Sequence, residues 1–488
     1  MAKRGKSDHG LIISIRSLIA SHFTDQVQVS EDLSDMQDSM DIPTPSGINE
    51  KALTRKIDLR VLPTLFIIYV AAFLDRVNIG NALTLKLPND LHLVGNQSNV
   101  ALTIFFVPYI LFEIPSNILL RRFKPHVWLS GCILAFGIVM LAQGFVKNYS
   151  GLLATRFFLG LAEAGIFPGS FYILSCWYKR DEALKRFAFY FSSVIVSNMF
   201  GGLLATAISK MDGDRGYHAW RWVFILEGIA TILIGFMSYF ALTDFPEEAR
   251  WLTEEERRFV IAKTGIDEHP NEAITFRRIF EFLADGKPLA GGLMYFGAVI
   301  IPLYAFSYFG PTIVKTLDYS IVETQLHTVP PFAAALALCL IIAYWSDRLN
   351  LRSPFIAFGI IINICGLAVL MKVHHKFHVE YAGLFLAAMG TFAIGPTVIC
   401  WFIMNLHGHT ERSIGSAWLI SFGNCGGIIA TFTFLSADAP YYHTGYSICL
   451  GMVCLGAASA VVYGLLLARQ NKRHSALGEK GGAKYYSL

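Results

Sequence analysis

One stretch of the sequence decides the fold: residues 150–178 read SGLLATRFFLGLAEAGIFPGSFYILSCWY, an apolar run that contains Arg156 and Glu163. An ionised arginine at the centre of a membrane helix costs at least about 2.5–3.5 kcal/mol, and a carboxylate is similarly unfavourable there. On a helix, positions seven apart lie on nearly one face, roughly 10 Å apart along the axis. We therefore predict that this face lines a polar cavity within a membrane protein. A buried ion pair that only holds helices together is the alternative.

The composition as a whole agrees with a chain that lies in a lipid bilayer. Of the 488 residues, 54% are hydrophobic and 16% charged, against roughly 25% charged in a typical soluble domain. The net charge of +4 is small, and the basic residues of the chain are scattered at the ends of apolar runs. We therefore expect no nucleic-acid partner. The eight cysteines lie in or beside apolar runs without metal-ligand spacing, which predicts packing residues and neither a metal nor a cofactor.

Apolar runs of about 20 residues, the length that spans a hydrocarbon core, repeat along the chain from Asp58 onward. The count is roughly twelve, so the predicted fold is an all-α membrane protein with twelve transmembrane helices. The expected spans are residues 58–82, 98–120, 126–146, 150–175, 186–209, 221–243, 288–313, 327–346, 353–372, 380–403, 412–435 and 445–468.

A long polar segment divides these spans into two sets. We expect a polar N-terminal tail at 1–57, a first bundle at 58–243, a linker at 244–287, a second bundle at 288–468 and a C-terminal tail at 469–488. Thr253, followed by three glutamates, predicts a capped helix within the linker. Basic residues gather near the tails and in the even-numbered connections, which predicts that both tails and the linker are cytosolic. Two six-helix bundles with a site between them at mid-membrane fit this pattern.

The first span carries a second charged cluster, Asp75-Arg76-x-Asn78. Adjacent residues on a helix point about 100° apart, so Asp75 and Arg76 should face different partners. A carboxyl group in apolar surroundings is suited to carrying a proton, whereas arginine keeps its charge and matches a carboxylate with its planar fork. Arg76 and Arg156 together therefore favour an anionic substrate.

Four motifs now indicate a family. They are Asp75-Arg76-x-Asn78 in the first span, Glu113-Ile-Pro115-Ser-Asn117 in the second, Arg156-x-Phe-x-Gly160-x-x-Glu163-x-Gly165-x-x-Pro168-Gly169 in the fourth and Trp220-Arg-Trp-x-Phe-x-x-Glu227-Gly at the start of the sixth. With these motifs the chain, from Asp58 to about Arg469, resembles the major facilitator superfamily and, within it, the anion:cation symporters of the fungal allantoate and nicotinate permease group.

The resemblance implies roles for individual residues. Asp75 and Glu163 would be proton-coupling carboxyls, Arg76 and Arg156 would bind the anion, and Asn424 in the eleventh span would hydrogen-bond the substrate. The connection after the second span departs from the superfamily pattern, because it reads RRFKP without an acidic residue. This departure puts the usual cytosolic gate in that half in doubt, although the second half keeps an Asp-Arg pair after its second span.

For several other intramembrane residues the sequence permits both a functional and a structural role. Tyr304, Ser307 and Tyr308 lie near Pro302 in the seventh span and either line the substrate site or pack as aromatic core. Glu113 is either a structural residue or an ion-coupling one. Asn96, in an Asn-Gln-Ser sequon within a predicted external loop, is a possible glycosylation site.

The resulting prediction is a proton-coupled symporter that moves a small organic anion, such as a carboxylate vitamin, by alternating access. Export of an acidic metabolite is the alternative, and a non-transporting anion sensor is a third reading. We do not expect an enzyme or an ATP-driven pump, because the sequence contains no catalytic triad, cofactor fingerprint or phosphate-binding loop. A selectivity-filter motif, expected for a channel, is absent too. The resemblance further implies a monomer in a eukaryotic, fungal plasma membrane.

Overall fold

The computed structural model describes residues 48–179, 182–264, 276–315, 321–373, 376–406, 408–434, 438 and 441–476. Within these residues all regular structure is helical, and twelve helices are long and apolar enough to cross a membrane. The predicted fold class is therefore confirmed. Most of the predicted N-terminal tail, part of the linker and the last twelve residues, 477–488, lie outside the described residues.

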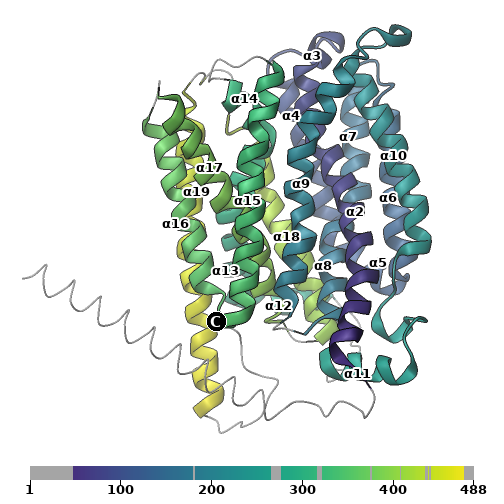
Figure 1. Cartoon of the computed structure of the whole chain (residues 1–488), viewed down its shortest axis with the longest axis vertical. Coiled ribbons are helices and arrows are strands. Elements are labelled where there is room, and N and C mark those ends of the chain that lie inside the picture. Colours follow the sequence, from purple (N-terminus) through teal and green to yellow (C-terminus); the bar gives the residue numbers. More distant parts are fainter. Residues whose placement is uncertain are drawn as a thin grey trace, which may run out of the picture.

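The first bundle lies on the right of Figure 1 and the second on the left. The helices of the first bundle are α2 (Glu50–Thr84), α3 (Leu87–Asp90), α4 (Gln97–Thr103), α5 (Phe106–Arg122), α6 (Pro125–Gln143), α7 (Tyr149–Glu163), α8 (Ile166–Trp177), α9 (Ala183–Ser209), η1 (Asp214–Gly216) and α10 (Ala219–Ala241). Those of the second are α13 (Gly286–Met294), the π-helical turn η4 (Tyr295–Ile300), α14 (Ile301–Lys315), α15 (Ile321–Leu349), α16 (Ser353–Lys372), α17 (Phe377–Ile403), α18 (Gly408–Ala430) and α19 (His443–Ala476). Between the bundles the chain forms η2 (Pro246–Glu248), α11 (Glu254–Thr264) and α12 (Phe276–Ala284).

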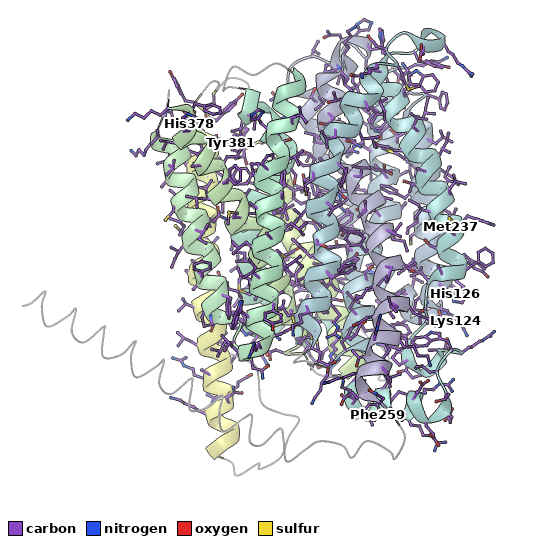
Figure 2. The ribbon with its side chains drawn as sticks, viewed as in Figure 1. Lys124, His126, Met237, Phe259, His378 and Tyr381 are labelled. Carbon is purple, nitrogen blue, oxygen red and sulfur yellow. The ribbon has the colours of Figure 1, made fainter. Side chains whose placement is uncertain are left out.

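These apolar sequences are expected to form helices, because a helix satisfies its backbone hydrogen bonds internally and lipid offers no hydrogen-bonding groups. Side chains on the outer surface are correspondingly apolar. Met237 of α10, for example, points away from the bundle and is 67% exposed (Figure 2). Inside the bundles, glycines allow close contact: a Cβ on Gly366 of α16 would lie 2.3 Å from the backbone nitrogen of Ala387 on α17. Such close packing of small residues is typical of helix association in membranes.

The fourth span is broken directly after Glu163, between α7 and α8. A glycine is needed at the break, because a Cβ on Gly165 would lie 1.9 Å from the hydroxyl oxygen of Ser116 on α5. The break leaves Arg156 and Glu163 together on α7, as the sequence spacing predicts, with Glu163 as its last residue.

We call the face of the molecule that carries Glu50 and Ala476 the tail face, and the opposite face, which carries α3, the loop face (Figure 1). On the tail face, α2 begins at Glu50 instead of residue 58. Contacts with α11 hold this extension: Lys56 pairs with Glu256 at 2.8 Å and Lys263 with Glu50 at 2.7 Å. The helix can therefore continue beyond the apolar run.

The predicted cap of the linker helix is confirmed. The backbone N–H of Glu256 donates to the Thr253 hydroxyl at 3.2 Å, and the N–H of Thr253 donates to the Glu256 carboxylate at 2.9 Å. This reciprocal pair satisfies two backbone donors at the start of α11, as a capping box does.

The two bundles touch on the tail face through unequal contacts. In the second bundle, Asp347 accepts the backbone N–H of Lys185 on α9 at 2.9 Å and pairs with Arg352 at 2.6 Å. In the first, Arg121 donates to the Thr410 hydroxyl at 3.3 Å. Both halves therefore contribute polar contacts across the interface on this face.

The bundles also touch on the loop face. The hydroxyls of Thr103 on α4 and Thr431 after α18 lie 2.8 Å apart, and Asn99 donates to the Thr431 carbonyl at 2.7 Å. Polar contacts therefore join the bundles on both sides of their central region.

Candidate functional site

The centre of the interface holds an ion pair between Arg76 of α2 and Glu163 of α7. Two guanidinium nitrogens of Arg76 donate to the two Glu163 oxygens, the Nε–Oε2 distance being 3.3 Å. Both side chains are almost fully buried, at 1% and 0% exposure. Glu163 therefore has its ion-pair partner on a different helix, and Arg156, seven positions earlier on the same helix, is not that partner.

Aromatic rings surround the Arg76 guanidinium. Its central carbon lies 4.6 Å from the ring centroid of Tyr109, 5.0 Å from Phe105 and 5.5 Å from Phe73. Ring faces attract a cation, and the attraction grows when water is excluded. These contacts help to hold an arginine at this depth in the protein.

Hydrogen bonds extend from Arg76 across the interface and back. Arg76 donates to the hydroxyl of Tyr304 on α14, and that hydroxyl donates to the side-chain oxygen of Asn424 on α18 at 3.0 Å. The amide of Asn424 then donates to Glu113 on α5 at 3.3 Å. We call Glu163, Arg76, Tyr304, Asn424 and Glu113 the bridging cluster. It brings together three residues that the sequence proposed for substrate binding, and it includes Glu113.

Arg156 lies outside the bridging cluster and has a different environment. Its Nε donates to the carbonyl of Ala101 at 3.4 Å, and its guanidinium lies 5.4 Å from the Phe105 ring centroid. Its two terminal nitrogens, although fully buried, have no hydrogen-bond partner among the described residues. The hydroxyl of Tyr308 on α14, close enough to interact electrostatically with Arg156, is also without one. A guanidinium fork of this kind has the geometry to bind a carboxylate with two parallel hydrogen bonds.

Asp75 faces into the first bundle, away from Arg76, as the sequence predicted. Its Oδ2 accepts the hydroxyl of Thr231 on α10 at 2.9 Å. One turn earlier on α10, Glu227 accepts the side-chain amide of Asn78, whose own oxygen accepts from Asn81 at 2.7 Å. We call Asp75, Asn78, Asn81, Glu227 and Thr231 the intra-bundle cluster.

Glu227 lies in the motif at the start of the sixth span, but the sequence alone predicts no role for it. The available signal was the one that identified Glu163, a carboxyl group inside an apolar run. Position alone did not show that Glu227 faces Asp75, since the two residues are separated by about 150 positions in the chain.

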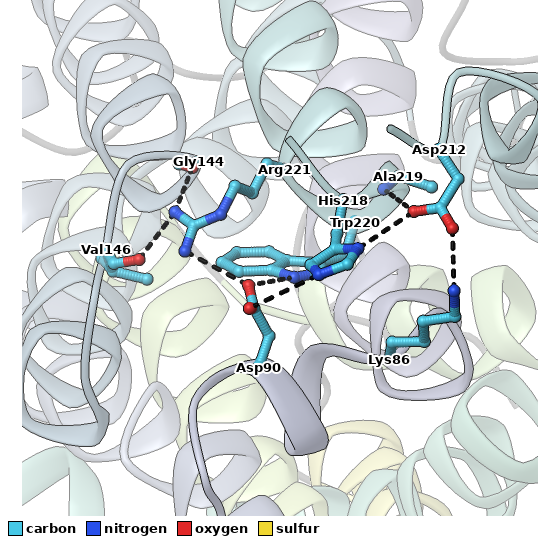
Figure 3. A network of polar contacts seen from close by, with 9 residues as sticks. All are labelled: Lys86, Asp90, Gly144, Val146, Asp212, His218, Ala219, Trp220 and Arg221. Carbon is cyan, nitrogen blue, oxygen red and sulfur yellow. Dashed lines mark hydrogen bonds and ion pairs between the residues drawn. The ribbon is translucent and has the colours of Figure 1, made fainter. Parts of the chain in front are cut away.

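A third polar network lies on the loop face and is structural (Figure 3). Asp90 accepts the indole N–H of Trp220 at 3.0 Å and a guanidinium N–H of Arg221 at 3.3 Å. Arg221 also donates to the carbonyls of Gly144 and Val146. The Trp-Arg pair that opens the sixth span therefore fastens α10 to α3 and to the connection between α6 and α7.

Asp212 belongs to the same network. Lys86 donates to it at 2.9 Å and the backbone N–H of Ala219 at 3.0 Å. These hydrogen bonds, that from Lys86 foremost, lower the pKa of the Asp212 carboxyl to about 2. Asp212 is therefore an ionised anchor at any physiological pH.

The remaining predicted site residue, Asn96, precedes α4 on the loop face and is exposed, and it belongs to neither cluster. Among the described residues, no group of three or more His, Cys, Asp or Glu side chains could hold a metal ion.

Two bundles of membrane-spanning helices with buried, ionisable residues between them define a secondary transporter. The family model of the Major Facilitator Superfamily matches residues 65–431. The chain belongs to this superfamily, and its predicted resemblance to fungal members is confirmed.

Similar proteins are fungal transporters. The chain is 34% identical to the MFS-type transporter cnsO of Penicillium expansum, over 88% of this chain and 86% of that protein. It is 32% identical to the high-affinity nicotinic acid transporter of Saccharomyces cerevisiae, over 89% and 81%. The major facilitator-type transporter hxnP of Emericella nidulans is 31% identical, over 80% and 81%. These relatives are transporters, so the expectation that the chain is not an enzyme holds.

Solved structures with the same fold include the proton:xylose symporter XylE, with a TM-score of 0.64 and 14% identity over 83% of this chain and 95% of that one. A bacterial homolog of the human lysosomal transporter Spinster, inward-facing and occupied, gives a TM-score of 0.59 at 16% identity over 83% and 96%. At these identities the likeness shows the fold alone.

Proposed function

We propose that this chain is a proton-coupled symporter for a small organic anion, and that Arg156 binds the anion. The observation that carries the proposal is the free fork of Arg156, which is fully buried yet has no partner for its terminal nitrogens among the described residues. An unpaired buried charge is costly. A carboxylate substrate would supply the missing acceptors in a bidentate arrangement.

The surroundings favour an aromatic carboxylate such as nicotinate. Phe105 lies against both arginines, and Tyr304 stacks on Tyr308 with ring centroids 5.6 Å apart. Flat rings of this kind accept a flat substrate ring, while the Tyr308 hydroxyl offers a further donor near Arg156. The name of the nicotinic acid transporter among the relatives supports the same substrate class.

The bridging cluster suggests how substrate and proton would be coupled. While Glu163 is ionised it occupies Arg76, and Arg76 holds Tyr304 of the second bundle. Protonation of Glu163 would release Arg76 to join Arg156 at the substrate, with Asn424 and Tyr304 free to donate to it. The bundles could then separate on one side and carry the anion across. Asp75 would take up a proton from its place in the intra-bundle cluster.

In the proposed orientation the tail face meets the cytosol. The transporter would be a monomer in the plasma membrane. Basic residues of the tail face, among them Lys56, Arg121 and Lys124, support this orientation through the positive-inside rule. Asn96 would then be external and open to glycosylation. A mass shift that a glycosidase removes, and that Asn96→Gln abolishes, would test this orientation.

The experiment for the function is uptake of labelled nicotinate and a panel of other carboxylates into yeast that lacks its own nicotinate transporter, at neutral pH and about pH 5. We expect uptake that rises at the lower pH and collapses with a protonophore. Arg156→Ala should reduce uptake by about 30-fold or more, because losing one partner of a buried charge pair, here that between Arg156 and the substrate carboxylate, costs roughly 2–5 kcal/mol. Arg156→Lys should keep part of the uptake, because lysine retains the positive charge, but not all of it, because lysine lacks the planar fork.

Arg258→Ala is the matched control, because Arg258 lies on α11 with its side chain 79% exposed. It should leave uptake unchanged. Normal uptake by Arg156→Ala would overturn the assignment of the binding residue. Absence of uptake for every acid, with protein present at the cell surface, would reject import and favour export, which accumulation of an acid in cells lacking the gene would then reveal.

A further inference from the structure

The intra-bundle cluster contains two carboxyl groups that take their donors from each other's helix. Asp75 of α2 accepts the Thr231 hydroxyl of α10, and Glu227 of α10 accepts the Asn78 amide of α2. On α2 the donor Asn78 lies three residues after Asp75, and on α10 the donor Thr231 lies four residues after Glu227. The two hydrogen bonds between α2 and α10 are therefore about one helical turn apart. These crossed hydrogen bonds place the two carboxyl groups side by side, close enough to interact electrostatically.

Each carboxyl keeps one oxygen without a donor. Asp75 Oδ1 and Glu227 Oε2 are both buried, and neither has a hydrogen-bond partner among the described residues. A buried polar atom without a partner costs about 1–3 kcal/mol, and more if it is charged. Each carboxyl group of the pair therefore lacks a donor for one of its oxygens.

No cation of the described residues completes it. Neither Asp75 nor Glu227 forms an ion pair there with a lysine, arginine or histidine. The other charged group that acts on Asp75 is Glu163 of α7, which Arg76 already holds. Arg76, the cation next to Asp75 in the chain, is thus committed to Glu163.

The outer side of the pair is apolar. A cavity of about 510 Å³ lies against Asp75 and Glu227 between α2, α9 and α10, and its other walls are mainly aliphatic and aromatic. Ile67 and Phe200 at this cavity are 51% and 55% exposed on the surface that meets lipid. Two negative charges side by side in such surroundings repel each other strongly, because neither water nor a counter-ion screens them.

We propose that Asp75 and Glu227 form one proton-binding unit, in which a single proton is shared between Asp75 Oδ1 and Glu227 Oε2. Binding the proton takes the pair from two negative charges to one and forms the one hydrogen bond that is missing. Glu227 is thereby half of the proton site. Its use in transport rests on the proposed symport, but the shared proton itself does not.

The test of the pair is infrared spectroscopy of the purified protein in detergent at neutral pH, where the carbonyl stretch of a protonated carboxyl is separate from that of a carboxylate. The wild-type protein should show a protonated-carboxyl band that both Asp75→Asn and Glu227→Gln remove. Either amide can donate to the remaining carboxylate, so both variants should fold. Glu163→Gln is the matched control and should keep the band, because Glu163 is ionised against Arg76. A band of equal strength in wild type and Glu227→Gln would overturn the proposal.

Transport gives a second, separate test with labelled nicotinate as the probe. Glu227→Gln should move the half-maximal pH of uptake toward acid by roughly one unit, because Asp75 loses the neighbouring carboxylate that favours its protonation. A merely structural role would lower uptake at all pH values without moving this midpoint, and that result would overturn the role of Glu227 in coupling. No nicotinate uptake by the wild-type protein would count against the proposed function alone, since the infrared result stands independently of it.

Discussion

Asp75 and Arg76 are neighbours on α2, yet they belong to two clusters with opposite connections. Arg76 reaches Glu163 within its own bundle and Tyr304 in the other, so the bridging cluster joins the two bundles. Asp75 reaches Thr231, and the intra-bundle cluster lies wholly between α2 and α10. A turn of about 100° around the helix separates these environments.

The difference matters because bundles that rock against one another must break or rebuild the contacts between them, while contacts within a bundle persist. Groups of the bridging cluster are therefore placed to respond to the position of the bundles and to a substrate between them. The intra-bundle cluster keeps its geometry through such a motion. The two sides of α2 therefore differ in their connections: the bridging cluster, which includes Glu163, meets the second bundle, and the intra-bundle cluster stays within the first.

The largest effect that sharpens this comparison should come from Arg76→Ala. It leaves the Glu163 carboxylate buried without a partner, which costs roughly 3–5 kcal/mol of stability. The double variant Arg76→Ala with Glu163→Gln should recover much of that loss, because it removes the unpaired charge. Thermal unfolding of the purified proteins in one detergent measures the loss of stability in the single variant and its recovery in the double variant. Equal melting temperatures for the single and double variants would contradict the ion pair.

A smaller effect is expected for Tyr304→Phe, which removes the hydroxyl between Arg76 and Asn424 while keeping the ring. Hydrogen bonds between membrane helices contribute about 0.6 kcal/mol on average and at most about 1.7 kcal/mol. The melting temperature should fall only slightly. A loss as large as that of Arg76→Ala would show that the hydroxyl, and not the ion pair, dominates the bridging cluster.

Asp75→Asn should cost still less stability than Tyr304→Phe, or should stabilise the protein, because it replaces an ionisable group in a buried place by a neutral one. The amide keeps the acceptor for Thr231 and supplies a donor toward Glu227. The comparison between the clusters would break if Asp75→Asn destabilised the protein as much as Arg76→Ala in the same unfolding assay.

The smallest effect is expected at Asp212 on the loop face. Its pKa is lowered from the usual 3.8 to about 2, so its stabilising contribution is complete above pH 3.8 and is lost only as the pH falls through about 2. Asp212→Asn should therefore leave the pH profile of nicotinate uptake unchanged between neutral pH and about pH 5. A moved midpoint would place a proton-sensing group in this network, outside both clusters.

Much of the candidate site could be predicted from the sequence. Charged residues inside apolar runs stand out because each has a large cost in lipid, and this signal identified Asp75, Arg76, Arg156 and Glu163. The helical period also showed that Asp75 and Arg76 face different ways. The capping box at Thr253 was predictable because its two residues lie three positions apart in the chain.

Long-range partners could not be predicted in this way. Arg76 lies 87 positions from Glu163 and 228 from Tyr304, and no local pattern states which carboxyl or hydroxyl a guanidinium will meet. The same limit hid the contact between Asp75 and Glu227. It also hid the fact that Arg156 is the arginine whose fork remains free.

The sequence by itself therefore determined the membrane-spanning helices, their number and the residues whose burial needs a reason, since these follow from the local free energy of placing side chains in lipid. Only the tertiary structure decided which buried charges neutralise one another and which do not, because a pairing depends on how helices distant in the chain rotate and pack. That distinction separates Arg76, which Glu163 holds, from Arg156, whose terminal nitrogens have no partner among the described residues.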